Sequence, residues 1–288
     1  MTAALINAAA FAGLTLTIGA VATRFLVLGR SGLTISERAP AARHAAQGAM
    51  WAAALLLVST IARAIQQVAD FAEPGEAWLP VLRLVLGTTA LGKALVLQAI
   101  WAAVVLLAFA SARRERERGW RLAALGIVVL ALTPGLLGHP VAAPQATIAL
   151  TAATFHVLAS GTWIGGLFHL WRATAVSSEA TLLRMLDAFH GLAMGAVALL
   201  LVSGGYQTLT ALHGVSNLTG TTWGRILVVK LLLVTAVLVL GHRHWRSAAT
   251  QIRSGERLAV RASLGVELAL ATLVIALTGL LTVTAPPD

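Results

Sequence analysis

Long apolar runs separated by short polar segments dominate the chain. Each run has about twenty residues or more, enough for a helix to cross a hydrocarbon core of roughly 30 Å. Membrane-spanning β-strands would instead show alternation over about ten residues. Because backbone groups in lipid must be paired within the segment, the runs predict helices. We expect an all-α, polytopic transmembrane bundle with eight spans, at residues 3–28, 45–69, 80–110, 120–138, 146–171, 185–208, 222–241 and 262–284.

Composition and charge placement agree with this class. Only 11% of the 288 residues are charged and 58% are hydrophobic, whereas about a quarter of a soluble domain is charged. The net charge of +10 comes from arginines that gather in alternate loops, namely Arg30, Arg38 and Arg43; Arg113, Arg114, Arg116, Arg118 and Arg121; Arg172 and Arg184; and Arg243, Arg246, Arg253, Arg257 and Arg261. The loop at 70–78 is acidic.

This distribution predicts topology. Basic loops stay on the cytoplasmic side, so both termini are expected on the outer, periplasmic side of the cytoplasmic (inner) membrane. The basic charge is therefore explained by the orientation of the chain in the lipid bilayer, and no nucleic-acid partner is expected.

The chain contains an internal repeat of four spans. AMWAAALLLVS (49–59) matches AMGAVALLLVS (193–203), GTTALGKALVLQ (87–98) resembles GTTWGRILVVK (220–230), and LTPGLL (132–137) matches LTGLL (277–281). An even number of spans inserts both copies in the same direction, which predicts two parallel four-helix repeats, 1–138 and 139–288. The first repeat contains one histidine, His44, and the second contains seven. The chemistry is therefore expected in the second repeat, with the first as a scaffold.

Histidine and methionine are the available soft ligands, because the chain has no cysteine. His156 lies about ten residues, or roughly 15 Å, inside its span. A polar residue at that depth faces a cavity or a partner, so His156 is either a ligand or relay, or a neutral histidine bonded to a neighbouring carbonyl. Trp163 is seven residues further on and is expected on the same helix face.

Span six carries a second candidate. Asp187, His190 and Met194 share one helix face, and imidazole with thioether suits copper, particularly Cu(I). Asp187 could orient the imidazole. The alternative is that Asp187 caps the helix, His190 lies at the interface and Met194 belongs to the core.

Four further features are less specific. His139 lies at an outer mouth, where it could receive a metal ion or be a solvated loop residue. The glycine pairs Gly161/Gly165 and Gly191/Gly195 favour close packing of spans five and six. His242 and His244 are expected to be interfacial cations, and Lys230 and Glu267 are placed at different depths.

The segments GHP (138–140), HVLASGTWIGGL (156–167), TTWGRILVVKLLL (221–233) and VELALATLVIALTGLLTVTAPP (266–287) together resemble the CopD family of copper resistance and uptake membrane proteins. Trp223, Pro140 and His242 depart from the family's usual residues. The resemblance implies copper handling at the cytoplasmic membrane, alongside a periplasmic copper-binding protein. By position it marks His139 and His156 as metal-associated, while His190 and Met194 are added from their spacing.

The resulting hypothesis is copper passage from outside to inside through His139, His156, and His190 with Met194, in a protein that is not an enzyme. One alternative is a redox protein in which His169 and His190 ligate a haem. Another is a non-transporting membrane partner of a soluble copper carrier.

Overall fold

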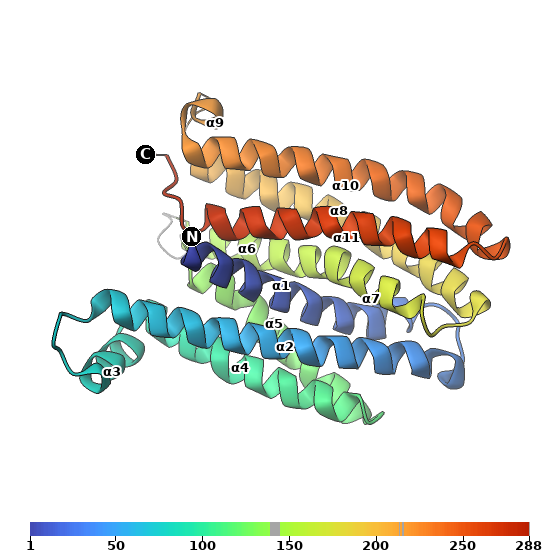
Figure 1. Cartoon of the computed structure of the whole chain (residues 1–288), viewed down its shortest axis with the longest axis horizontal. Helices are drawn as coiled ribbons and strands as arrows, with labels where there is room; N and C mark the ends of the chain where they lie inside the picture. Colours follow the sequence, from blue (N-terminus) through green and yellow to red (C-terminus); the bar gives the residue numbers. More distant parts are fainter. Residues whose placement is uncertain (139–144, 213, 215, 288) are drawn as a thin grey trace.

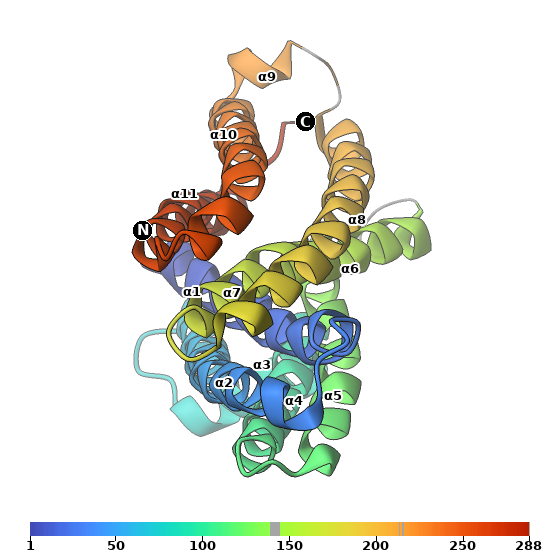
Figure 2. The ribbon, with the colours of Figure 1, turned by 90° about the vertical axis from the view of Figure 1, so that its right-hand side faces the viewer.

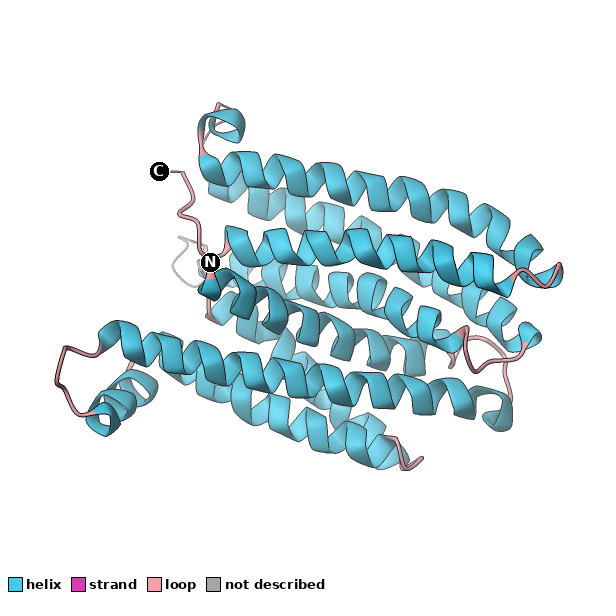
Figure 3. Ribbon diagram, in the orientation of Figure 1, coloured by secondary structure: helices cyan, strands magenta, loops and turns pink. Residues whose placement is uncertain are grey.

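The computed structural model describes residues 1–138, 145–212, 214 and 216–287, and this part of the chain is a bundle of long helices without strands (Figures 1 and 3). Eight of its helices are long and apolar enough to cross a membrane, which confirms the predicted spans. The first four are α1 (Thr2–Ala22), which continues into the π-helical turn η1 (Thr23–Val27), α2 (Ile35–Phe71), α4 (Ala90–Ala112) and α5 (Glu117–Leu136). The last four are α6 (Ala146–Ser160), which continues through the π-helical turn η3 (Gly161–Gly165) into α7 (Gly166–Ala173), α8 (Glu179–Leu212), α10 (Thr222–Arg253) and α11 (Arg257–Leu281).

Both chain ends lie at one end of the bundle, and the arginine-rich turns lie at the other (Figure 1). At the arginine-rich end, Arg24 forms an ion pair of 2.7 Å with Glu117, and Arg43 pairs with Glu115. These pairs connect the first two spans to the turn between α4 and α5. The assignment of this end to the cytoplasm stays a prediction from the charge distribution.

The third span differs from its predicted form. Its expected helix over 80–110 is broken into α3 (Trp78–Thr88) and α4 by Thr89, whose backbone is extended and whose hydroxyl accepts the Gly92 amide at 2.9 Å. A Cβ on Gly92 would lie 2.1 Å from the Val85 carbonyl oxygen, so only glycine permits this close return.

The same local structure begins the seventh span. Thr221 accepts the Gly224 amide at 3.0 Å, and a Cβ on Gly224 would lie 2.1 Å from the carbonyl oxygen of Asn217 in the short helix α9 (Asn217–Gly220). The two segments that resemble each other in sequence, 87–98 and 220–230, therefore also fold alike.

The helices pack around α1 and η3 at the middle of the bundle (Figure 2). In the first half α1 packs on α2, α2 on α4, and α4 on α5. In the second half α6 packs on α8 and α10 on α11, but α8 and α10 meet over a short stretch only and diverge toward one end (Figure 2). Between the halves, α1 contacts α11 and α5 contacts α6. The first span of each half thus packs on the last span of the other half, as two parallel repeats would. The division into two repeats stays a prediction.

Glycines bring the first and fifth spans into direct backbone contact. A Cβ on Gly19 would lie 2.1 Å from the carbonyl carbon of Gly165, and one on Gly165 would lie 2.2 Å from the Thr15 carbonyl oxygen. The expectation that Gly161/Gly165 and Gly191/Gly195 pack spans five and six together is wrong, because the two glycine pairs do not face each other. Gly161 and Gly165 face α1, while Gly191 and Gly195 have no atom within 4 Å of a Cβ built on them.

We predict that Gly165→Ala destabilises the protein by about 1–3 kcal/mol or more, because its methyl group meets backbone that cannot move aside. Gly195→Ala is the matched control, made in the same protein. It should be neutral or stabilising by roughly 0.5–1 kcal/mol, since alanine favours the helix and meets nothing. The measurement is the fraction of detergent-solubilised protein that remains monodisperse after heating. Equal melting profiles for the two variants would contradict the proposed packing.

Candidate functional site

His156 lies half-buried on α6 and faces α8. Its Nδ1 is 3.2 Å from the Ser203 hydroxyl oxygen, and its ring occupies the space beside Gly204, where an added Cβ would lie 3.0 Å from Cε1. The Ser203 hydroxyl donates its only proton to the Leu199 carbonyl at 2.6 Å. Ser203 therefore accepts from His156, which places the histidine proton on Nδ1 and leaves the Nε2 lone pair available as a ligand.

Lys230 of α10 is close enough to His156 for their charges to interact. An ammonium group at this depth in a membrane is costly and is typical of ion pathways. No ion pair of the described residues includes Lys230. When Lys230 carries its charge, it would repel a metal cation bound at His156.

A second group of histidines lines a cavity of about 120 Å³ in the arginine-rich half of the second repeat, between α7, α8, α10 and α11. The helices α8 and α10 both line it, and the rings of His190 and Trp245 bring them into contact there. Its polar lining residues are His190 of α8, His242, His244 and Gln251 of α10, and Ser263 and Glu267 of α11, and Met194 and Trp163 also line it. We refer to this space as the inner cavity.

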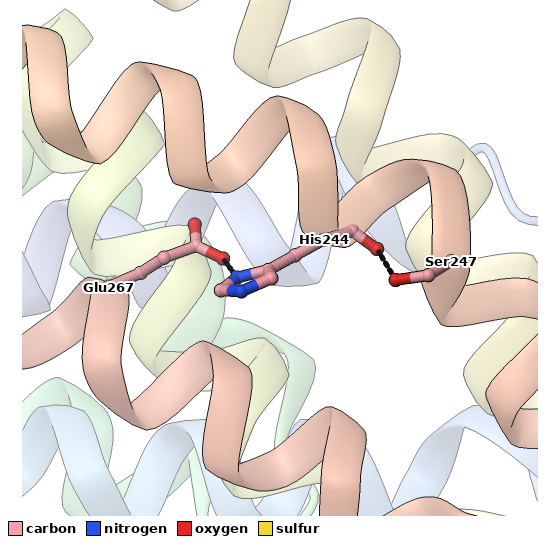
Figure 4. Close-up of polar contacts among 3 residues, drawn as sticks. All are labelled: His244, Ser247 and Glu267. Carbon is pink, nitrogen blue, oxygen red and sulfur yellow. Dashed lines mark hydrogen bonds and ion pairs between the residues drawn. The ribbon is translucent and has the colours of Figure 1, made fainter.

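His244 and Glu267 form the strongest polar contact of the inner cavity. His244 Nδ1 and Glu267 Oε1 are 2.6 Å apart, and the carboxylate reaches across from α11 (Figure 4). Glu267 is only 3% exposed. When the carboxyl group is ionised it can only accept, so His244 then donates through Nδ1–H and keeps Nε2 for another partner. A carboxylate behind a histidine is the arrangement that orients metal-binding imidazoles in proteins.

His190 is held by an aromatic stack and not by the expected carboxylate. Its ring lies 3.7 Å from the Trp245 ring, with 9° between the planes. Asp187 is exposed, and no hydrogen bond of the described residues joins it to His190. Met194 borders the inner cavity, and its side chain is 60% exposed.

The three predicted metal residues that the structure describes, His156, His190 and Met194, do not share one site. His190 and Met194 share the inner cavity, whereas His156 lies outside its lining. His139 lies outside the described residues. Trp163, expected beside His156, lines the inner cavity instead. Within the described part of the chain, no three His, Cys, Asp or Glu side chains are close enough to hold one metal ion.

His169 is a buried structural residue. It is 2% exposed, its Nε2 lies 2.9 Å from the Leu16 carbonyl oxygen on α1, and its Cε1 is close to Gly48 of α2. It does not line the inner cavity with His190. The two histidines considered for haem ligation therefore face different parts of the described structure.

Sequence reasoning placed His242 and His244 at the interface and missed their joint cavity with Glu267. A signal was present in the sequence. α10 and α11 form a hairpin around Ser254–Glu256, and His244 and Glu267 lie at nearly equal distances on either side of it. Equal distances from a tight turn give equal depths, so the two residues were candidates for a cross-helix pair.

Comparison with known families divides the chain into two matched parts. Residues 1–147 match the N-terminal domain of copper resistance protein D-like proteins, and residues 183–281 match copper resistance protein D. The second match covers the helices α8, α10 and α11 that line the inner cavity, while His156 lies between the two matched parts. Neither the curated proteins nor the solved structures compared with the chain include a match.

The two matches together cover most of the sequence. They agree with a multi-pass helical membrane protein whose soft ligands are histidine and methionine. The chain belongs to the copper resistance protein D family.

Proposed function

We propose that this protein passes copper ions across the cytoplasmic membrane, from the outer side to the cytoplasm, and that it catalyses no chemical reaction. The inner cavity is the observation that carries the proposal, because it combines three imidazoles and a thioether from α8 and α10. These ligands suit copper, and thioether favours Cu(I). Membership of the family supports copper as the transported ion.

The proposed path runs through the second half. His139 receives copper at the outer side, from a periplasmic copper-binding protein. His156 then binds the ion through Nε2, since Nδ1 is engaged by Ser203. Release to the cytoplasm follows through His190, Met194, His242 and His244, which line the inner cavity.

Weak binding at each step is what passage requires, because an ion that binds too tightly does not leave. The described residues support this in two ways. Their histidines are spread out and do not form a three-ligand cluster. In addition, the charge of Lys230 opposes long residence of a cation at His156.

We predict that His156→Ala lowers copper uptake by about tenfold or more, the equivalent of losing roughly 1.4 kcal/mol of binding at the rate-limiting site. The measurement is Cu(I) accumulation in proteoliposomes, with copper content of the purified protein determined by elemental analysis. His44→Ala removes a histidine of the first half and is expected to leave uptake unchanged.

Two outcomes would replace the transport proposal. Unchanged uptake by His156→Ala protein that still inserts would indicate a non-transporting membrane partner of a copper carrier. A Soret band in the purified wild-type protein, with no copper after Cu(I) loading, would indicate a haem protein.

Lys230→Met tests the repulsion at His156. Removing the positive charge while keeping the side-chain length should raise copper retained per protein by about fivefold, for roughly 1 kcal/mol of relieved repulsion. Uptake should fall at the same time, because a tighter site releases its ion more slowly. Retention below that of the wild type would mean that Lys230 assists binding. Lys93→Met, in the first half, is the control.

Glu267 is expected to act by holding His244. Glu267→Ala should lower copper affinity by roughly 10- to 100-fold, the range found for residues that orient metal-binding histidines. Glu267→Gln keeps an oxygen acceptor for His244 Nδ1–H and should lose less. The check is copper retention against a graded Cu(I) chelator, with thermal stability measured in parallel. If both variants bind copper with the affinity of the wild type, Glu267 has no part in copper binding.

A further inference from the structure

Arg63 occupies an unusual position in the first half. It lies on α2, eight residues before the end of the helix at Phe71, and its side chain is half-buried within the predicted span 45–69. Its one hydrogen bond among the described residues is a long one, 3.4 Å from Nη2 to the Leu137 carbonyl oxygen. A charged side chain within a membrane span is costly and pairs with an opposite charge or marks a functional path.

The described residues provide no such opposite charge. The three ion pairs among them are Arg24–Glu117, Arg43–Glu115 and His244–Glu267. Arg63 instead faces a cavity of about 290 Å³ at the end of the bundle that holds the chain termini, between α1, α2, α4, α5 and α11. We call this space the outer cavity. It is lined by Arg63, Asn7, Gln98 and Thr282 together with apolar residues, and within the described part of the chain no carboxylate lines it.

The neutral polar groups of the outer cavity are fixed in place with hydrogen-bond donors left over. Asn7 Nδ2 donates to the Thr282 hydroxyl at 2.9 Å. Gln98 accepts from Thr60 at 3.0 Å and donates through Nε2 to Thr133 at 2.7 Å. Each amide nitrogen carries two protons and each of these bonds uses one, while the guanidinium of Arg63 has five.

The chemistry of these groups defines the ligand. A guanidinium matches the planar pair of oxygens on a carboxylate or phosphate, and side-chain amides and hydroxyls complete the shell of an oxyanion. The cavity is also far larger than the roughly 10–15 Å³ that one water needs.

We propose that the outer cavity binds a phosphate oxyanion through Arg63, with Asn7 and Gln98 as supporting donors. The phosphate belongs either to the headgroup of an anionic lipid of the outer leaflet or to a free ion. This site uses none of the residues of the copper path and does not depend on copper transport.

The first test measures the reactivity of Arg63 in the wild-type protein. Protein in phosphatidylcholine nanodiscs is treated with the arginine reagent phenylglyoxal, and modification is followed by mass spectrometry. Sodium phosphate at constant ionic strength is expected to slow modification of Arg63 by the factor 1+[L]/Kd, about tenfold at nine times Kd. Arg83, an exposed arginine of α3, is the internal control and should not respond.

A parallel arm replaces part of the phosphatidylcholine with phosphatidylglycerol, in phosphate-free buffer. Protection in this arm alone identifies the lipid headgroup, and protection by sodium phosphate alone identifies the free ion. Absence of protection in both arms, or equal protection of Arg83, would overturn the proposal.

Variants provide the second test. The phosphate- or lipid-dependent rise in melting temperature should be lost in Arg63→Gln and kept in Arg83→Gln, which makes the same change of charge. Asp288, six residues beyond Thr282 and outside the described residues, is tested as an internal partner. Faster modification of Arg63 in Asp288→Asn protein without phosphate would show that the chain supplies its own counter-charge, which would overturn the proposal.

Discussion

Backbone contact between α1 and η3 is the constraint on which the arrangement of the two halves depends. Gly19 and Gly165 meet without room for a methyl group on either side, and Thr15 and Ile18 close the same contact from α1. In lipid there is no hydrophobic force between apolar helices, so close van der Waals packing must hold them together. The crossing also sets where the other spans can lie, because α2 and α11 pack on α1 while α6 continues directly into η3.

The two halves solve the problem of polar groups in the hydrocarbon region differently. In the first half Thr60, Gln98 and Thr133 form a closed neutral network, with each hydrogen bond between 2.7 and 3.0 Å. Aligning the repeated segments places Gly204, Lys230 and Thr278 at these positions in the second half. A glycine there makes space for the His156 ring, and a lysine replaces the glutamine. At these repeated positions, the first half thus carries a neutral hydrogen-bonded network and the second half carries a lysine next to a glycine that accommodates a histidine ring.

Sequence reasoning was most successful where a single physical requirement acts along the whole chain. The thickness of the membrane sets the length of each apolar run, so the eight spans could be read directly. The break at Thr89 was missed because apolar residues continue on both sides and only a hydroxyl cap and one glycine cause it. Glycine spacing identified a packing face at Gly161 and Gly165 but not the helix that it meets. His190 and Met194 were placed together by helix periodicity, whereas His244 and Glu267 required the depth of two spans to be compared.

The short contact between α8 and α10 has a mechanical consequence. Close van der Waals packing holds helices together in lipid, and α8 and α10 share the least of it among spans that are consecutive in the described chain, so this seam resists widening the least. The tight hairpin of α10 and α11 would move as one rigid unit. The remaining spans are joined through the glycine crossing of α1 and η3. Widening of this seam would therefore move the hairpin relative to the rest of the bundle. The seam runs past the histidines of the inner cavity, so widening it would make them more accessible.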